Sequence, residues 1–371
     1  MNILFLIASI ILSTFTLPSS VEASSRISTF TGYPPIHIFG NASSSPVGLS
    51  PTDIKNAYHL PMNGGTGTIA IIAAYNDPHI EKDLNVFNRA FNLPLCTTAN
   101  RCFEKHPMGI SIANHAGWSL EQSLDTEWAH AIAPQAKILL IQAKSASGVH
   151  LLEAVDYARQ RKDVVAVSMS WGGREFRGET ALDEHFISTT SPAMVFFASS
   201  GDSGAGVNWP AVSKYVVGVG GTSLSTTTEN GSRVREVAWS GSGGGVSSFE
   251  TQPPYQQTYN IVRAHTMRSV PDVSYNADPR HGYSVYRSNG TSRGWYVLGG
   301  TSAGAPQWAG IQALGMSVSL DSMYKDKKSD TNENFFRDIV SGSNGECTYY
   351  CTARAHYDYI TGLGSPLTTK F

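Results

Sequence analysis

Residues 193–204 read AMVFFASSGDSG, an apolar run that ends abruptly in serine, glycine and aspartate. A short, uninterrupted apolar run rich in β-forming residues is typical of a strand that is buried on both faces of a parallel sheet. The polar residues behind it, among them Asp202, are then expected at the carboxyl end of that strand. Open α/β sheets bind their ligands at this edge, so Asp202 is a candidate functional residue.

The same pattern recurs along the chain and indicates the fold class. Four further runs are short, apolar and strand-like: residues 67–74, 138–143, 164–168 and 215–219. Between them lie segments whose apolar residues recur with helical spacing: residues 80–91, 120–133 and 149–161. Strands alternating with helices predict an α/β fold with a mainly parallel central sheet. The length of 371 residues suits one large domain of this kind.

The composition excludes several classes of protein. The chain has 27 Lys and Arg residues against 29 Asp and Glu residues, a formal net charge of −2. It therefore lacks the excess positive charge with which proteins bind nucleic acid or an anionic membrane. Only 15% of the residues are charged and 35 residues are glycine, which excludes a disordered, coiled-coil or fibrous protein. We expect a monomer that binds neither nucleic acid nor a membrane.

The amino terminus has the character of a secretory signal peptide. Residues 3–17 are apolar apart from hydroxyl groups, and the small residue Ala23 follows at a distance suited to cleavage. We therefore assign residues 1–23 to a signal peptide, residues 24–47 to an extended arm rich in serine and proline, and residues 48–371 to the domain. No later segment has the roughly 18 uninterrupted apolar residues of a membrane span, so we expect a secreted, extracellular protein.

The four cysteines fall into two local pairs, Cys96 with Cys102 and Cys347 with Cys351. In an exported protein, such closely spaced pairs predict two small disulfide loops. The alternative is one zinc ion held by all four thiolates, but neither pair has the two-residue spacing of zinc knuckles. We therefore expect two disulfides.

The strongest chemical signal is the segment GTSAGAP at residues 300–306, which follows a strand-like run at 294–298. The small residues around Ser302 leave its hydroxyl accessible, and Pro306 with the apolar run that follows it indicates the start of a helix. Unpaired N–H groups at such a start stabilise developing negative charge. Ser302 is therefore a candidate nucleophile, although glycine-flanked serines also occur in ordinary turns.

A serine nucleophile needs a base that takes its proton. One candidate is His356, the only histidine after Ser302, with Asp338 as its partner, in the chain order of α/β-hydrolases. The other candidate is the pair Glu121 and Asp125, which lie four residues apart on one face of a predicted helix. In a partly dry site these two carboxyls would share a proton, so that one acts as base and the other orients it. On a solvated helix they would only form an acidic face.

Together these motifs resemble the sedolisins, the serine-carboxyl peptidases, which have a subtilisin-like three-layer fold and use glutamate where subtilisins use histidine. The matching residues are Glu-x-x-x-Asp at 121–125, Ser-Gly-Asp at 200–202, Gly-Thr-Ser-x-x-x-Pro at 300–306, Asp-Ile at 338–339, and Tyr-Asp-x-x-Thr-Gly-Leu-Gly-Ser-Pro at 357–366. The motifs occur in the order of the family, and the resemblance covers about residues 48–367.

The resemblance implies a role for each site residue. Ser302 would be the nucleophile, Glu121 its general base and then the acid toward the leaving amine, and Asp125 the residue that orients Glu121. Asp202 would stabilise the oxyanion, for which it must be protonated, so that an acidic optimum is implied. The implied reaction is peptide-bond hydrolysis in polypeptide substrates through an acyl-enzyme. The segment along which the substrate backbone would lie is Ser170, Trp171 and Gly172.

The resemblance also implies one structural calcium ion near the carboxyl terminus. Its ligands would be the side chains of Asp338 and Asp358 and the backbone carbonyls of Ile339, Arg354 and His356. With about one water, these groups would supply the six to eight oxygens that calcium requires. Arg354 and His356 stand where the family usually has glycine, so we expect a strained loop here. Turn capping is the alternative role for the two aspartates.

The sequence thus predicts a secreted, acid-acting serine-carboxyl endopeptidase. Two alternatives remain: a histidine-dependent serine hydrolase that uses Ser302 and His356, and an inactive secreted binding protein with the same fold. Sedolisins usually carry a long pro-segment, which residues 24–47 are too few to supply, so this chain either folds without one or has it encoded or lost elsewhere. A further hypothesis is that the arm partly occupies the cleft. This hypothesis is wrong if deleting residues 24–45 leaves the activity unchanged.

Overall fold

The middle layer of the domain is a sheet whose central strands are the apolar runs of the sequence. The computed structural model describes residues 26–226, 233–288, 293–316, 318–326 and 335–367, so the predicted signal peptide lies outside it. The central strands are β2 (Thr68–Ala74), β4 (Lys137–Ala143), β5 (Val164–Met169), β7 (Val195–Ser199) and β9 (Val216–Thr226). Their apolar side chains are buried on both faces, as the uninterrupted runs predict.

The order of the strands confirms a mainly parallel sheet. In the described residues it has eight strands in the order β10-β9-β7-β5-β2-β4-β3, with β13 also paired to β9. All neighbours are parallel except β10 with β9. The three strands at the periphery of this sheet are β3 (Phe103–Pro107), β10 (Arg233–Ala238) and β13 (Val273–Asn276). The carboxyl ends of the parallel strands therefore share one edge.

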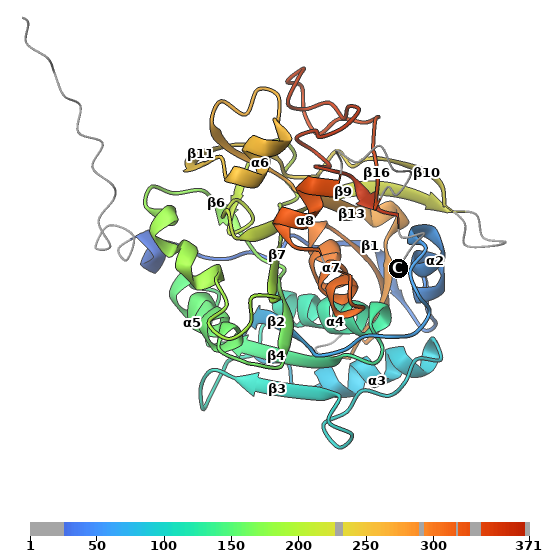
Figure 1. Cartoon of the computed structure of the whole chain (residues 1–371). Helices are drawn as coiled ribbons and strands as arrows, with labels where there is room; N and C mark the ends of the chain where they lie inside the picture. Colours follow the sequence, from blue (N-terminus) through green and yellow to red (C-terminus); the bar gives the residue numbers. More distant parts are fainter. Residues whose placement is uncertain (1–25, 227–232, 289–292, 317, 327–334, 368–371) are drawn as a thin grey trace, which may run out of the picture.

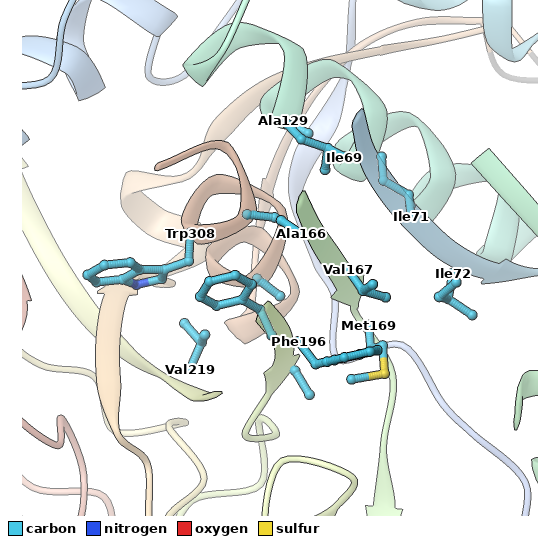
Figure 2. Packing of buried hydrophobic residues seen from close by; sticks show 14 of the residues in the cluster. Ile69, Ile71, Ile72, Ala129, Ala166, Val167, Met169, Phe196, Val219 and Trp308 are labelled. Atoms are coloured by element: carbon cyan, nitrogen blue, oxygen red, sulfur yellow. The ribbon is translucent and has the colours of Figure 1, made fainter. Parts of the chain in front are cut away.

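Helices cover both faces of this sheet and complete the three layers (Figure 1). On one face lie α4 (Ala116–Ile132) and α7 (Gly304–Ala313), with α3 (Ile80–Ala90) packed on α4. The other face is covered by α5 (Gly148–Arg159), which contacts β2 and β4. In Figure 2, Ala129 of α4 and Trp308 of α7 lie over strand residues such as Ile69 and Phe196. This architecture confirms the predicted subtilisin-like α/β fold.

A smaller antiparallel sheet stands beside the main one. It consists of β1 (His37–Ser43), β15 (Gly294–Gly299) and β14 (Tyr283–Arg287), with β15 in the middle. The other elements are short: α2 (Pro51–Tyr58), α6 (Pro254–Tyr259), α8 (Leu320–Asp326), β6 (Gly173–Arg174), β8 (Asn208–Trp209), β11 (Gly245–Thr251), β12 (Met267–Val270), β16 (Phe336–Arg337), β17 (Ser365–Pro366), and the 3-10 turns η1 (Glu179–Phe186), η2 (Pro279–His281) and η3 (Thr301–Ala303). Because β15 ends just before Ser302, the smaller sheet positions the candidate nucleophile.

The arm predicted at residues 24–47 lies on the domain and supplies one strand of the smaller sheet. Its described part begins with Ile27 and Phe30, whose side chains are buried in the main core. It then crosses the molecule from the side of α5 to β1, where the chain is drawn in blue (Figure 1). The arm is thus held at its start by buried apolar side chains and further on by the strand pairing of β1, while most of its residues are exposed.

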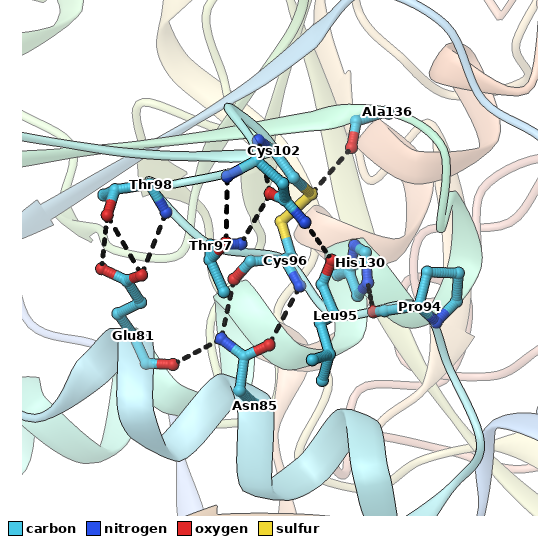
Figure 3. The surroundings of a disulfide bond; sticks show 11 residues. Glu81, Asn85, Pro94, Leu95, Cys96, Thr97, Thr98, Cys102, His130 and Ala136 are labelled. Atoms are coloured by element: carbon cyan, nitrogen blue, oxygen red, sulfur yellow. Dashed lines mark hydrogen bonds between the residues drawn. A yellow bond between two sulfur atoms is a disulfide. The ribbon is translucent and has the colours of Figure 1, made fainter.

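Both predicted disulfides are present, Cys96 with Cys102 and Cys347 with Cys351. All four sulfur atoms are bonded to each other in pairs, so the alternative of a four-thiolate zinc site is wrong. Figure 3 shows the first pair, where the side-chain amide of Asn85 bonds the backbone of Cys96. Among the described residues, no helix is long and apolar enough to cross a bilayer.

Candidate active site

Helix α4 carries the two carboxyls that the sequence singles out. Its amino-terminal cap is His115, whose ring nitrogen accepts from the N–H of Trp118 at 3.3 Å. From Trp118 onward every residue of the helix is buried, because the sheet, α3 and α7 surround it. Glu121 and Asp125 are both 0% exposed. The alternative interpretation, in which Glu121 and Asp125 only form a solvated acidic face of the helix, is therefore wrong.

Asp125 is linked to the segment of Ser302 through one hydroxyl group. Ser170, which directly follows β5, donates from its Oγ to Asp125 Oδ1 at 2.7 Å. The same hydroxyl lies 3.2 Å from the backbone oxygen of Ser302. The carboxyl end of a central strand thus joins α4 to the turn that carries the candidate nucleophile.

Ser302 lies in a tight turn between β15 and α7. The turn depends on Gly300, because its φ of +121° lies in the region that favours glycine. A Cβ atom at this position would also clash with the backbone oxygen of Pro35. The Ser302 hydroxyl is buried and lies 3.5 Å from the backbone oxygen of Ser170. Helix α7 begins two residues later, so the sequence-based expectation of a strand, a turn and a helix around Ser302 is confirmed.

Burial governs the charge of the carboxyl pair. It raises the pKa of Glu121 well above the usual range, and the neighbouring charge of Asp125 raises it further, while the interaction with the Ser302 hydroxyl opposes both effects. Burial also raises the pKa of Asp125 well above the usual range, opposed by its hydrogen bonds with Ser170 and Glu121. Two like charges so close in a dry site cannot both form readily, so at least one of the two carboxyls holds a proton.

Asp202 approaches the same turn from the carboxyl end of β7. Its Oδ1 accepts from the N–H of Thr301 at 2.8 Å and from the Thr301 hydroxyl at 2.7 Å. Its Oδ2 lies 3.0 Å from Nε2 of His37, a residue of the arm. Burial raises the pKa of Asp202, and the bonds from His37 and Thr301 oppose that rise. A protonated Asp202 could donate a hydrogen bond next to Ser302.

The arm passes through the groove between these residues. The backbone of Tyr33 pairs with Gly172, with N–H···O distances of 3.0 and 3.2 Å in the two directions. Two residues further on, the carbonyl oxygen of Pro35 accepts from the N–H of Ser302 at 3.4 Å. Beside the arm remains a cavity of about 690 Å³, lined by Gly172, Asp202 and other residues of the strand ends.

Sequence reasoning missed three of these residues. Thr301 was visible in the GTSAGAP motif, but only Ser302 was given a chemical role, although a hydroxyl beside a nucleophile is a potential partner for Asp202. His37 and Pro35 carry no local signal, since the arm has no hydrophobic period and its partners lie far away in the sequence. Trp171, the middle residue of the expected substrate edge, is buried with no exposed surface.

The carboxyl-terminal loop holds the five residues expected to bind calcium. Asp338 Oδ2 accepts from the N–H of His356 at 2.6 Å, and Asp358 accepts from Arg354, Ile360 and Thr361. The φ of His356 is +67°, which lies in the region that favours glycine, whereas Arg354 has no positive φ. His356 is exposed, and no interaction between described residues joins it to Ser302.

This loop fits a calcium ion by its oxygen atoms. The carbonyl oxygens of Ile339, Arg354 and His356 accept no hydrogen bond from any residue that the structure describes. Calcium prefers carbonyl and carboxylate oxygens of this kind.

The fold and the turn around Ser302 define a subtilisin-like protein in which buried carboxyl groups lie near that serine. Residues 109–336 match the family model described as the subtilase family. The chain therefore belongs to the subtilase family and, within it, to the sedolisins. This assignment confirms the resemblance seen in the sequence.

Individual relatives support the same assignment. Kumamolisin from a Bacillus species is 30% identical over 366 residues, covering 88% of this chain and 63% of that protein. Sedolisin from a Pseudomonas species is 28% identical, covering 54% of this chain and 39% of that protein. Dog tripeptidyl-peptidase 1 is 33% identical, covering 36% and 26%. The chain thus spans less than two thirds of the length of each of these relatives.

A solved structure shows the same architecture. Pseudomonas sedolisin superimposes with a TM-score of 0.71 and 25% identity, covering 88% of this chain and 96% of that chain. A psychrophilic protease superimposes with a TM-score of 0.54 at 18% identity, which supports the fold alone. The expected three-layer arrangement therefore agrees with that of solved subtilase-like proteins.

Proposed function

We propose that the protein is a secreted serine-carboxyl endopeptidase that hydrolyses polypeptides at acidic pH. The observation that carries this proposal is the fully buried pair Glu121 and Asp125, of which Asp125 is joined through the Ser170 hydroxyl to the backbone of Ser302. A carboxyl base remains usable in acid, where a histidine base would be protonated. The two disulfides suit an exported protein.

The reaction begins with attack of Ser302 Oγ on the carbonyl carbon of the scissile bond. Glu121 accepts the hydroxyl proton, and Asp125, held by Ser170, keeps the carboxyl of Glu121 in position. Collapse of the tetrahedral intermediate passes that proton to the leaving amine and leaves an acyl-enzyme on Ser302. Water, deprotonated by Glu121, then releases the acyl group and regenerates the serine.

The developing oxyanion requires donors that are in place before the reaction. The N–H of Ser302 supplies one, because it already points to a carbonyl oxygen, that of Pro35. The protonated carboxyl of Asp202 supplies the second, and burial favours this state by raising its pKa. Since the donor is lost when Asp202 ionises, activity falls as the pH rises through the pKa of Asp202.

The course of the arm favours endopeptidase over tripeptidyl-peptidase action. A tripeptidyl-peptidase would need a cleft that is closed beyond the third residue before the scissile bond. Here the arm continues past Tyr33, the third residue counted back from Pro35: Gly32 donates to Ala146 at 2.8 Å, and Thr31 pairs with Ser147. The cleft thus accommodates a longer chain on its amino-terminal side.

The carboxyl-terminal loop would hold one calcium ion through Asp338, Asp358 and the carbonyls of Ile339, Arg354 and His356. The ion would supply positive charge that ties two loop segments together, far along the chain from the catalytic residues. Its role is structural, so its removal lowers the melting temperature.

A pH–rate profile for cleavage of an unstructured polypeptide tests the proposal. We expect maximal activity at about pH 3–5, loss of activity in Ser302→Ala, and full activity in His356→Ala, since His356 only lies in the calcium loop. Activity that rises through about pH 6–7 and disappears in His356→Ala would favour the histidine-dependent hydrolase. Binding of the polypeptide without any cleavage would favour the inactive binding protein.

A further inference from the structure

The imidazole ring of His130 lies beside the disulfide of Cys96 and Cys102. One ring nitrogen of His130 and the two sulfur atoms all lie within 4.8 Å of one another. His130 is in the last turn of α4, whereas the two cysteines close the loop that precedes β3 (Figure 3). Among the described residues, this is the one cluster of three or more His, Cys, Asp or Glu side chains whose ligand atoms come so close.

One hydrogen bond determines which nitrogen of His130 is available to a ligand. Nε2 lies 2.9 Å from the carbonyl oxygen of Pro94. Because a carbonyl oxygen can only accept, Nε2 carries the proton, and Nδ1 of the neutral ring keeps a free lone pair. Nδ1 has no hydrogen-bond partner among the described residues, and His130 has no exposed surface. A buried acceptor without a donor is unusual, since it costs free energy unless a ligand uses it.

Histidines that bind metal ions in proteins have this arrangement. The ring nitrogen that does not bind the metal donates to a backbone carbonyl or a carboxylate, which fixes the tautomer and the orientation of the ring. Pro94 provides that carbonyl for His130. Nδ1 is then the nitrogen that remains for an ion beside two sulfur atoms, and thiolate with imidazole is a ligand set that Zn²⁺ prefers.

Hydrogen bonds that do not involve sulfur hold the cysteine loop in place. The side-chain amide of Asn85 accepts from the N–H of Cys96 at 3.0 Å and donates to its carbonyl oxygen at 2.8 Å. At the other end of the loop, Cys102 donates its N–H to the carbonyl of Thr97 at 3.1 Å and accepts from the N–H of Ile138 at 2.8 Å. The Cα atoms of the two cysteines are 4.8 Å apart. We therefore expect the two sulfur atoms to stay close when the bond between them is broken.

We propose that Cys96, Cys102 and His130 form a zinc site when this disulfide is reduced. A phosphine reductant gives two electrons to the sulfur–sulfur bond and takes up the oxygen of one water molecule, whose protons convert both sulfur atoms to thiols. Zn²⁺ then displaces these two protons into solvent and binds both thiolates and Nδ1. Tetrahedral zinc, with bonds of about 2.0–2.3 Å, places such ligand atoms about 3.6–3.8 Å apart, so small rotations of the side chains suffice.

The ion would connect two segments that the disulfide does not connect. The disulfide only closes the loop on itself, whereas the ion joins this loop to α4 through His130. Cys96 and His130 are fully buried and Cys102 is half-buried, so water reaches the fourth position of the ion from the side of Cys102. Because zinc binds only the folded arrangement of the three ligands, its binding stabilises the reduced protein. The inference is independent of the proposed peptidase function.

Alkylation of individual cysteines in the full-length protein tests the inference. The protein is reduced with a phosphine at neutral pH in excess calcium, which occupies the carboxylate sites, and is treated with iodoacetamide with or without one equivalent of Zn²⁺. Peptide mass spectrometry follows each cysteine. We expect zinc to slow the alkylation of Cys102 about tenfold or more and to leave that of Cys347 and Cys351 unchanged. Zinc should also raise the melting temperature of the reduced protein.

Two histidine substitutions provide a matched comparison. His130→Gln keeps an N–H group for the carbonyl of Pro94 but removes the lone pair of Nδ1. Its affinity for zinc, measured by competition with a chromophoric chelator after reduction, should fall about tenfold or more. His150→Gln changes a half-buried histidine on α5 and should bind zinc like the wild type. If His130→Gln does not fold, the alkylation of the wild type still decides between the outcomes.

Several results would overturn the inference. Equal protection of Cys102 and Cys347 would mean that zinc binds exposed thiols without a built site. Equal affinities of His130→Gln and the wild type would exclude the imidazole as a ligand. Zinc bound as tightly by the oxidised protein would place the ion at other residues. If reduction unfolds the protein and zinc does not restore the fold, the loop depends on its disulfide and the proposed site does not form.

Discussion

Glu121 and Asp358 are carboxyl side chains with almost no exposed surface, 0% and 1%, yet their surroundings differ. Asp358 accepts four hydrogen bonds, from three N–H groups and one hydroxyl, in the carboxyl-terminal loop. Glu121 interacts instead with the hydroxyl of Ser302 and with a second carboxyl, Asp125. Burial raises the pKa of both, that of Asp358 only to about 6 and that of Glu121 well above its usual range.

The number of donors thus separates a structural carboxyl from one that exchanges protons. Donors stabilise the charged form and offset the cost of burial, so Asp358 can serve as a fixed acceptor. Where donors are few, burial keeps the pKa of a carboxyl raised, which makes its ionised form a stronger base and suits it to take the proton of a nucleophile. Substitutions that change donors or charge in either region test this difference.

The largest effect is expected from Glu121→Gln, which keeps the shape of the side chain and removes its basicity. The turnover number should fall roughly 10²- to 10⁴-fold, the range of general acid–base catalysis. Glu127→Gln is the matched control, since Glu127 is buried on the same helix but accepts from the N–H of Tyr286 at 3.0 Å. Steady-state kinetics at the optimal pH that show equal losses in both variants would contradict the role of Glu121.

A smaller loss is expected at Asp202. Asp202→Ala removes one oxyanion donor and should lower kcat roughly 10²- to 10³-fold with little change in KM. Asp202→Asn offers an N–H donor at every pH, so its activity should extend to higher pH than that of the wild type. The pH–rate profiles of the two variants check this expectation. An unchanged alkaline limb in Asp202→Asn would show that ionisation of Asp202 does not limit the reaction.

In the carboxyl-terminal loop we expect an effect on stability and none on chemistry. Asp358→Ala leaves four donors without their acceptor and should lower the free energy of unfolding by about 3 kcal/mol. A calcium chelator should lower the melting temperature of the wild type, but not further that of Asp358→Ala. Scanning calorimetry measures both. An equal response to the chelator in both proteins would argue against a calcium ion in this loop.

The smallest effect concerns the dependence of stability on pH. Burial, followed by the charge of Asp183, raises the pKa of Glu250 to about 8, so the folded protein retains a proton that the unfolded chain releases above about pH 4.5. This contribution favours the fold at low pH and is lost as the pH rises from about 4.5 to 8. Glu250→Gln should reduce the loss of stability between pH 4 and 8 by about 1–3 kcal/mol.

Urea unfolding at the two pH values measures this difference. Glu153→Gln, on an exposed part of α5, is the control and should follow the wild type at both values. If Glu250→Gln loses as much stability as the wild type on going to pH 8, then Glu250 is ionised in the folded protein. Its burial would then be offset by a partner, as at Asp358.

Much of the fold followed from local patterns in the sequence. The central strands β2, β4, β5, β7 and β9 were predicted within about two residues at their starts, because uninterrupted apolar runs are characteristic of strands buried on both faces. The antiparallel strands β14 and β10 were not predicted, since each is paired at an edge and has a mixed pattern. Their identity depends on the neighbours that they find in three dimensions.

The candidate site divides in the same way. Ser302, Glu121, Asp125 and Asp202 were found by spacing and by motif, because each lies in a short segment whose local chemistry is unusual. The contact of His37 with Asp202 and the position of Pro35 at Ser302 had no such signal. The carboxyl-terminal loop was expected to be strained at Arg354 and His356, but only His356 has a positive φ, because backbone conformation depends on the whole loop.

By itself, the sequence determined the α/β class, the two disulfides and the residues with catalytic potential, because periodicity and residue chemistry are local properties. Only the tertiary structure decided that Glu121 and Asp125 are buried beside a serine that lies far away in the chain. It also decided that the arm lies in the cleft with the Pro35 carbonyl on the N–H of Ser302. Desolvation and strand pairing depend on which segments meet in space. These two effects bring the candidate catalytic residues together in one buried site.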